Sequence, residues 1–166
     1  MKKVFYKLIP LIIGLVVVFT DAKTKKLALL KLQGFVSSDF PYGGKVVFQN
    51  LFSGIDFSLN LVANKGAAWG VFSDYPELLT YVRIGIVLFL MTRIFRPAVR
   101  FVRRVALALI CAGAIGNLID HFKYGYVVDM FHFSFWNYDF PVFNVADVSI
   151  FIGTLSLLFS KGKVRL

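Results

Sequence analysis

Two aspartates lie where they could hydrolyse a peptide bond if the fold brought them together. Asp129 lies in YVVDMF, among apolar neighbours, and Asp147 lies in FNVADVSIF, about one turn inside a long apolar run. Two carboxyl groups close together at low dielectric cannot both ionise, so one of them keeps a proton. The ionised carboxylate can take a proton from water while the protonated one polarises a carbonyl oxygen. Such a pair needs neither a metal nor a cofactor.

Both acids also have a structural interpretation. Asn144 followed three residues later by Asp147 matches an N-cap and an acid in the first turn of a helix, where the helix dipole favours negative charge. Asp129 could be an ordinary loop acid, although its apolar neighbours would partly desolvate it and raise its pKa. The spacing leaves capping and catalysis both open.

Asp21 and Asp120 complete a group of four acids expected near one membrane plane. Asp21 is expected to terminate the first helix, and Asp120, after Asn117, to end the third. A carboxylate at a helix C-terminus meets the negative end of the dipole, so it needs a cationic or hydrogen-bonding partner. The nearby candidates are Lys123 for Asp120, and Lys23 or Lys25 for Asp21.

The segment NKGAAWG, residues 64–70, also has two interpretations. Asn64 offers side-chain hydrogen bonds, and the small residues from Gly66 onward let another backbone approach closely. A turn that leads out of a strand and a clamp on a substrate backbone both fit.

The sequence lacks the residue spacings of several other catalytic and metal sites. The two histidines, His121 and His132, lack the HExxH spacing of zinc peptidases, and no serine lies in GxSxG. The single cysteine, Cys111, excludes a disulfide framework and a CxxC metal site.

The composition indicates a membrane protein. Of 166 residues, 58% are hydrophobic and the mean hydropathy is +0.72, which exceeds what a soluble domain of this size usually shows. A hydrocarbon core about 30 Å thick needs about 20 helical residues. Four segments of roughly that length are expected to span it: 4–20, 77–95, 102–119 and 142–160.

The distribution of charge predicts how these spans are oriented. Basic residues cluster before the first span, between the second and third, and after the fourth, and none of the nine acids lies in those clusters. The positive-inside rule therefore places both termini and the 96–104 loop in the cytoplasm, with segments 21–76 and 120–141 outside. The net charge of +10 does not indicate nucleic-acid binding, because the cations are not interleaved with stacking aromatics.

A small sheet is expected in the first outer segment. In IDFSLNLVAN, apolar and polar residues alternate from Ile55 to Asn64, apart from Val62, as in a half-buried strand. KVVFQNLF precedes it, with Ser53 and Gly54 between, which predicts a hairpin.

Five short motifs, in order, resemble those of the lipoprotein signal peptidases (signal peptidase II), which are bacterial membrane aspartic endopeptidases. They are DAKTK, NKGAAWG, GNLIDH, VVDM and FNVAD. The resemblance covers essentially the whole chain. It implies one membrane-embedded domain over residues 1–166, an all-α four-transmembrane-helix bundle with a small periplasmic β-sheet cradle.

Carried over by position, the resemblance implies that Asp129 and Asp147 are catalytic. The residues that would line or support the site are Asn64, Gly66, Asn117, Asp120, Asn144, Asp21, Lys25 and His121. Three positions depart from the motifs: Ala22 replaces glutamine, His121 replaces arginine and Met130 replaces phenylalanine. The change at His121 matters most, because arginine is a permanent cation with a planar fork of donors.

The resemblance further implies removal of the signal peptide from diacylglyceryl-modified prolipoproteins, by cleavage just before the lipidated cysteine. The enzyme would be a monomer in the bacterial inner membrane, with its site at the periplasmic face and no metal or cofactor. A transporter or channel with an acid relay would need polar residues deep in the bundle. The apolar segments there contain few polar residues apart from Arg83. A scaffold with acids only as caps would not explain why acids, amides and small residues gather on one side.

Overall fold

The computed structural model describes residues 2–34, 43–65, 76–96 and 99–160. Four helices and four strands follow one another along the chain: α1 (Lys2–Lys31), β1 (Lys45–Leu51), β2 (Ile55–Asn64), α2 (Pro76–Ile94), α3 (Phe101–Tyr124), β3 (Val127–Phe135), β4 (Tyr138–Asp139) and α4 (Val145–Phe159).

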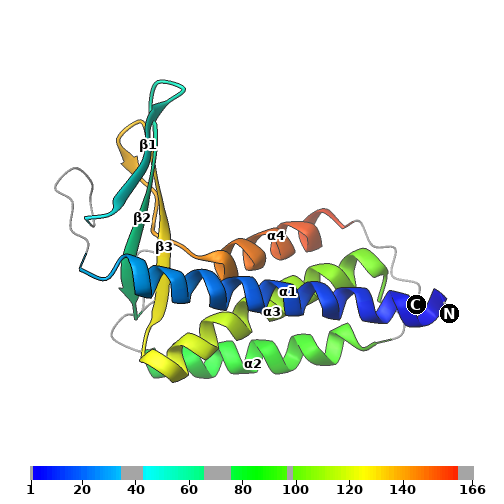
Figure 1. Ribbon diagram of the computed structural model, residues 1–166. Helices are drawn as coiled ribbons and strands as arrows, with labels where there is room; N and C mark the ends of the chain where they lie inside the picture. The colour runs from blue at the N-terminus through cyan, green and yellow to red at the C-terminus, as the bar shows by residue number, and fades with distance from the viewer. Residues whose placement is uncertain (1, 35–42, 66–75, 97–98, 161–166) are drawn as a thin grey trace.

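The helices lie side by side and alternate in direction, and the sheet stands across one end of them (Figure 1). α3 packs against α1, α2 and α4. The start of α1, the end of α2, the start of α3 and the end of α4 all lie at the end opposite the sheet. The protein is thus mostly helical, with the small antiparallel sheet at the end where the predicted acids occur.

Small residues allow α3 and α4 to approach closely. A Cβ added at Gly113 of α3 would clash with the backbone oxygen of Ala146 and lie 2.5 Å from the Oγ of Ser149. A Cβ at Gly153 of α4 would lie 2.7 Å from the backbone oxygen of Ala106. Such small-residue contacts are typical of helix pairs in membranes.

The sheet has the order β1-β2-β3-β4 and is antiparallel. The predicted hairpin is confirmed as β1 and β2, and its turn contains three residues with positive φ, Phe52, Ser53 and Gly54. β3 was not predicted, although Phe131, Phe133 and Phe135 alternate with His132 and Ser134 in its second half. Its pairing with β2 sets Val62 opposite Asp129 and Asn64 opposite Val127, which places Asn64 beside the candidate acid.

The prediction that Asp21 terminates the first helix is wrong. α1 continues ten residues further, to Lys31, through AKTKKLALLK. Alanine, lysine and leucine favour helix, and Ala28 and Leu32 are buried against Val128 and Met130 of β3. This last part of α1 therefore exists because it covers the sheet.

The helix ends also differ from the predicted spans. α3 extends to Tyr124, five residues past its predicted span, while α4 is shorter than its own, with 15 residues. Judged by length and composition, α3 is the one helix in the described ranges suited to crossing a membrane, and α4 is a shorter apolar helix. α2 has 19 residues but carries Glu77, Arg83 and Arg93.

Replacing Gly113 by alanine should destabilise the protein by about 1–3 kcal/mol, because the added methyl group would overpack the α3–α4 contact. Thermal unfolding in detergent measures this as a lower Tm. Gly85→Ala in α2 is the matched control, since its Cβ would meet no described atom within 4 Å. Equal melting temperatures for the two variants would contradict the close packing.

Candidate functional site

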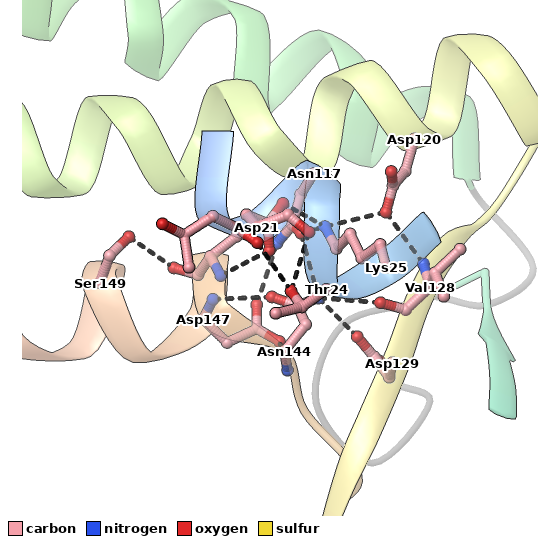
Figure 2. A network of polar contacts seen from close by, with 12 residues as sticks. Asp21, Thr24, Lys25, Asn117, Asp120, Val128, Asp129, Asn144, Asp147 and Ser149 are labelled. Atoms are coloured by element: carbon pink, nitrogen blue, oxygen red, sulfur yellow. Dashed lines mark hydrogen bonds and ion pairs between the residues drawn. The ribbon is translucent and has the colours of Figure 1, made fainter. Parts of the chain in front are cut away.

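The predicted acids and amides meet where the helices join the sheet. Figure 2 shows Asp21 and Lys25 from α1, Asn117 and Asp120 from α3, Asp129 from β3, and Asn144 with Asp147 from the start of α4. These residues are far apart in the chain, and they form one connected network of hydrogen bonds and ion pairs.

Lys25 is the cation of this network. Its side chain is buried, and its Nζ lies 2.7 Å from Oδ2 of Asp21 and 2.8 Å from Oδ2 of Asp120. It also donates to Oδ1 of Asn117 at 2.9 Å. Of the two lysines predicted for Asp21, Lys25 is therefore the partner.

The partner predicted for Asp120 was wrong. Lys123 places its Nζ 4.9 Å from the ring centroid of Tyr124, and Asp120 pairs with Lys25 instead. The reason is that α3 continues to Tyr124, so Asp120 lies a turn inside the helix and faces α1.

The two acids held by Lys25 also fix neighbouring backbone. Asp21 accepts a hydrogen bond from the backbone N–H of Ala146 at 2.8 Å, in the first turn of α4. Asp120 accepts one from the backbone N–H of Val128 at 3.1 Å, in β3. A single ion-paired unit thus sets the positions of the two segments that carry Asp129 and Asp147.

Asn144 connects the two candidate catalytic acids. Its Nδ2 donates to Oδ1 of Asp129 at 2.6 Å. Its backbone N–H donates to Oδ2 of Asp147 at 3.2 Å, and its Oδ1 accepts from the backbone N–H of Asp147 at 2.9 Å. The predicted helix cap is confirmed as a full capping box, and the same residue reaches across to β3.

Asp129 is a buried acid, with 1% of its surface exposed. It accepts a second hydrogen bond, from Nδ2 of Asn64 at 2.9 Å. Burial, and then the charge of Asp147, raise the pKa of Asp129 to about 7, against the hydrogen bonds from Asn64 and Asn144 that favour its charged form. The interpretation of Asp129 as a loop acid is wrong, because it lies within β3.

Asp147 opens onto a cavity of about 700 Å³. Asn117 Nδ2 donates to its Oδ1 at 2.9 Å. The cavity wall is mostly apolar side chains from the segment before α4 and from the first turns of α4. Its lining comprises Asn64, Arg83, Asn117, Val127, Phe140, Pro141, Val142, Phe143, Asp147, Val148, Ile150, Phe151 and Thr154.

Arg83 is a lining residue that the sequence analysis did not assign to the site. The sequence did contain an indication of this role, because a single arginine in an otherwise apolar run is unusual and marks functional positions in membrane helices.

One predicted site residue within the described ranges, His121, does not join the network. The ring of His121 lies 6.0 Å from that of Phe122, and the polar contacts found within the described ranges do not connect it to the acids. It follows Asp120 directly on a helix, so it lies on a different face. Gly66 lies outside the described residues. In those ranges, no three His, Cys, Asp or Glu side chains are grouped to hold a metal ion.

The chain matches the family model described as signal peptidase (SPase) II over residues 13–161. It is 37% identical to a lipoprotein signal peptidase of Chlamydia pneumoniae over 86% of this chain and 83% of that protein. It is 32% identical to a lipoprotein signal peptidase of Staphylococcus haemolyticus over 96% of this chain and 94% of that protein.

Two solved structures have a similar fold, and both are described as bacterial membrane enzymes. One superposes with a TM-score of 0.72 at 26% identity, covering 95% of this chain and 93% of the other. The second has a TM-score of 0.68 at 29% identity, covering 93% of each chain.

Replacing Lys25 by methionine should cost about 3–5 kcal/mol of stability, because Asp21 and Asp120 would be left as buried acids without a cation. Chemical or thermal unfolding in detergent measures the loss. Lys26→Met is the matched control, since Lys26 is exposed and should behave as wild type. A Lys25→Met protein as stable as the Lys26→Met protein would contradict the central place of this ion pair.

Proposed function

Because the chain belongs to the signal peptidase (SPase) II family and is therefore a peptidase, we propose that it hydrolyses the peptide bond just before the lipidated cysteine of diacylglyceryl-modified prolipoproteins. Asp129 and Asp147 activate the attacking water. The observation that carries the assignment is Asn144, which hydrogen-bonds both acids, at 2.6 Å and 3.2 Å.

The environments of the two acids support different roles. Burial and the nearby charge of Asp147 raise the pKa of Asp129 to about 7, so Asp129 keeps the shared proton in acidic solution and loses it as the pH rises through about 7. The carboxylate of Asp147 receives N–H donors from Asn117 and from the backbone of Asn144, and it lies in the first turn of α4. Donors and the helix dipole both stabilise negative charge there.

Hydrolysis then proceeds in two steps. Asp147 takes a proton from water as the water oxygen attacks the scissile carbonyl carbon, and Asp129 gives its proton to the carbonyl oxygen. When the intermediate collapses, Asp147 returns its proton to the nitrogen of the cysteine, the C–N bond breaks, and Asp129 regains a proton from the hydroxyl. The acids end in their starting states.

The cavity supports a substrate that reaches the acids from lipid. Its walls are mostly apolar, and Asp147 lies on its lining together with Asn64 and Asn117. A precursor held by an apolar signal segment and two acyl chains would place its scissile bond at the mouth of the bundle. Binding of these remote parts would then hold the bond against the water.

We place the site at the outer face of the bacterial inner membrane. Arg93, Arg103 and Arg104 lie near the helix ends opposite the sheet, and the basic clusters of a membrane protein face the cytoplasm. Four membrane crossings with both termini inside would then put the sheet and the acids in the periplasm.

Asp129→Asn and Asp147→Asn should each lower cleavage of a diacylglyceryl precursor by at least about 1,000-fold, because either change removes a group that carries a proton in the reaction. Purified protein is assayed on the lipidated precursor and on the same precursor without lipid, which should be cleaved far more slowly.

Asp139→Asn is the control, because Asp139 is an exposed acid of the same sheet, and it should cleave at the wild-type rate. All variants should reach wild-type levels in membranes. Full activity in either the Asp129 or the Asp147 variant would overturn the assignment.

The activity should fall as the pH rises above about 7, roughly tenfold per unit, because the proton on Asp129 is then lost. Asn64→Ala removes a donor that favours the charged form of Asp129. The pKa of Asp129 should then rise, and the alkaline limb should move to higher pH. Profiles of kcat/KM against pH test this, and an unmoved limb in Asn64→Ala would count against Asp129 as the proton carrier.

A further inference from the structure

We propose that Arg83 is a specificity-determining residue that binds a neutral carbonyl oxygen of the lipidated precursor inside the cavity. The proposal rests on the proposed function and adds a contact to it. Arg83 comes from α2, whereas most of the cavity wall comes from residues 140–154. Arg83 and Asp147 therefore reach the same cavity from different helices.

The position of Arg83 lets its charge act at the site. Among the described residues that line the cavity, it is the one cation and Asp147 is the one acid. Its charge is near enough to interact with Asp147 and, more weakly, with Asp129. Arg83 lies two turns inside α2, and α2 begins at the end of the bundle that carries the sheet. Since side chains tilt towards the N-terminus of their helix, the guanidinium extends towards the level of the acids.

The chemistry of the lining limits what Arg83 can bind. Guanidinium groups donate hydrogen bonds and accept none, so the ligand atom must be an acceptor. An anionic ligand would meet the carboxylate of Asp147 in the same cavity, and like charges repel strongly at low dielectric. The apolar side chains Phe140, Val142 and Phe151 also disfavour a charged group. A neutral carbonyl in an apolar setting fits these conditions.

The precursor carries such a carbonyl in two places. One is the acyl ester of the diacylglyceryl group, and the other is a backbone amide of the signal segment. Both offer the same acceptor to the planar fork of arginine, and lysine would bind it less well because its ammonium lacks that fork. A precursor with two ether-linked alkyl chains keeps the apolar chains and the amides but has no ester carbonyl.

The test measures KM and kcat for the full-length protein on the diacyl and the dialkyl precursor, with wild type and Arg83→Gln. Arg83→Gln should raise KM for the diacyl precursor by about 10-fold and change kcat by less than about twofold, since a hydrogen bond from a charged donor is lost from the bound state. If the partner is the ester carbonyl, the KM of the wild type for the dialkyl precursor should be about as high as the KM of Arg83→Gln for the diacyl precursor. Arg83→Gln should then show no further rise in KM on the dialkyl precursor. If the partner is a backbone amide, the variant should lose the same factor on both precursors.

Controls separate this contact from structural effects. Arg93→Gln makes the same change in the last turn of α2 and should leave KM unaltered. Arg83→Lys should give an intermediate KM, and it replaces Arg83→Gln if that protein does not accumulate. An unchanged KM in the Arg83 variants, or a fall in kcat alone, would overturn the proposal. A wild-type protein that cleaves neither precursor would instead overturn the proposed function.

Discussion

The site depends on one buried cation and the carboxylates that surround it. Lys25 holds Asp21 and Asp120 at 2.7 Å and 2.8 Å, and removing this cation would leave two buried acids without their partner. Asp129 and Asp147 share no such direct ion pair with Lys25 among the described contacts. A second full negative charge beside the first is therefore unfavourable. In the proposed mechanism, the pair retains the proton that aspartic hydrolysis needs because Lys25 is already paired with Asp21 and Asp120.

The same ion pair gives the site its rigidity. Through Asp21 it fixes the first turn of α4, and through Asp120 it fixes the start of β3. Asn117 receives a hydrogen bond from Lys25 and donates one to Asp147. Reactive groups carried by packed helices and strands are held more accurately than groups on loops, and here each acid is held by elements far from it in sequence.

Local patterns in the sequence predicted the local features. Alternation over IDFSLNLVAN predicted a strand, and Asn144 before Asp147 predicted a cap, because both depend on neighbouring residues. Features set by distant packing were missed. β3 is a strand because β2 pairs with it, α1 continues past Asp21 because Ala28 and Leu32 cover the sheet, and Asp120 pairs with a lysine 95 positions away rather than with Lys123. Among the residues that the resemblance implied, the acids join the polar network, whereas His121 does not, because it lies one helical step away from Asp120 on another face.

The two cations near the acids differ in what they are able to contact. Lys25 is 1% exposed, and its contacts are protein carboxylates and an amide, so a substrate cannot reach it. Arg83 lies on the wall of a cavity beside Asp147. A buried cation whose contacts are all within the protein stabilises the fold, whereas a cation on a cavity wall is placed where a ligand could contact it. In the proposed function, Lys25 therefore belongs to the supporting side of the site and Arg83 to the side that would face the substrate.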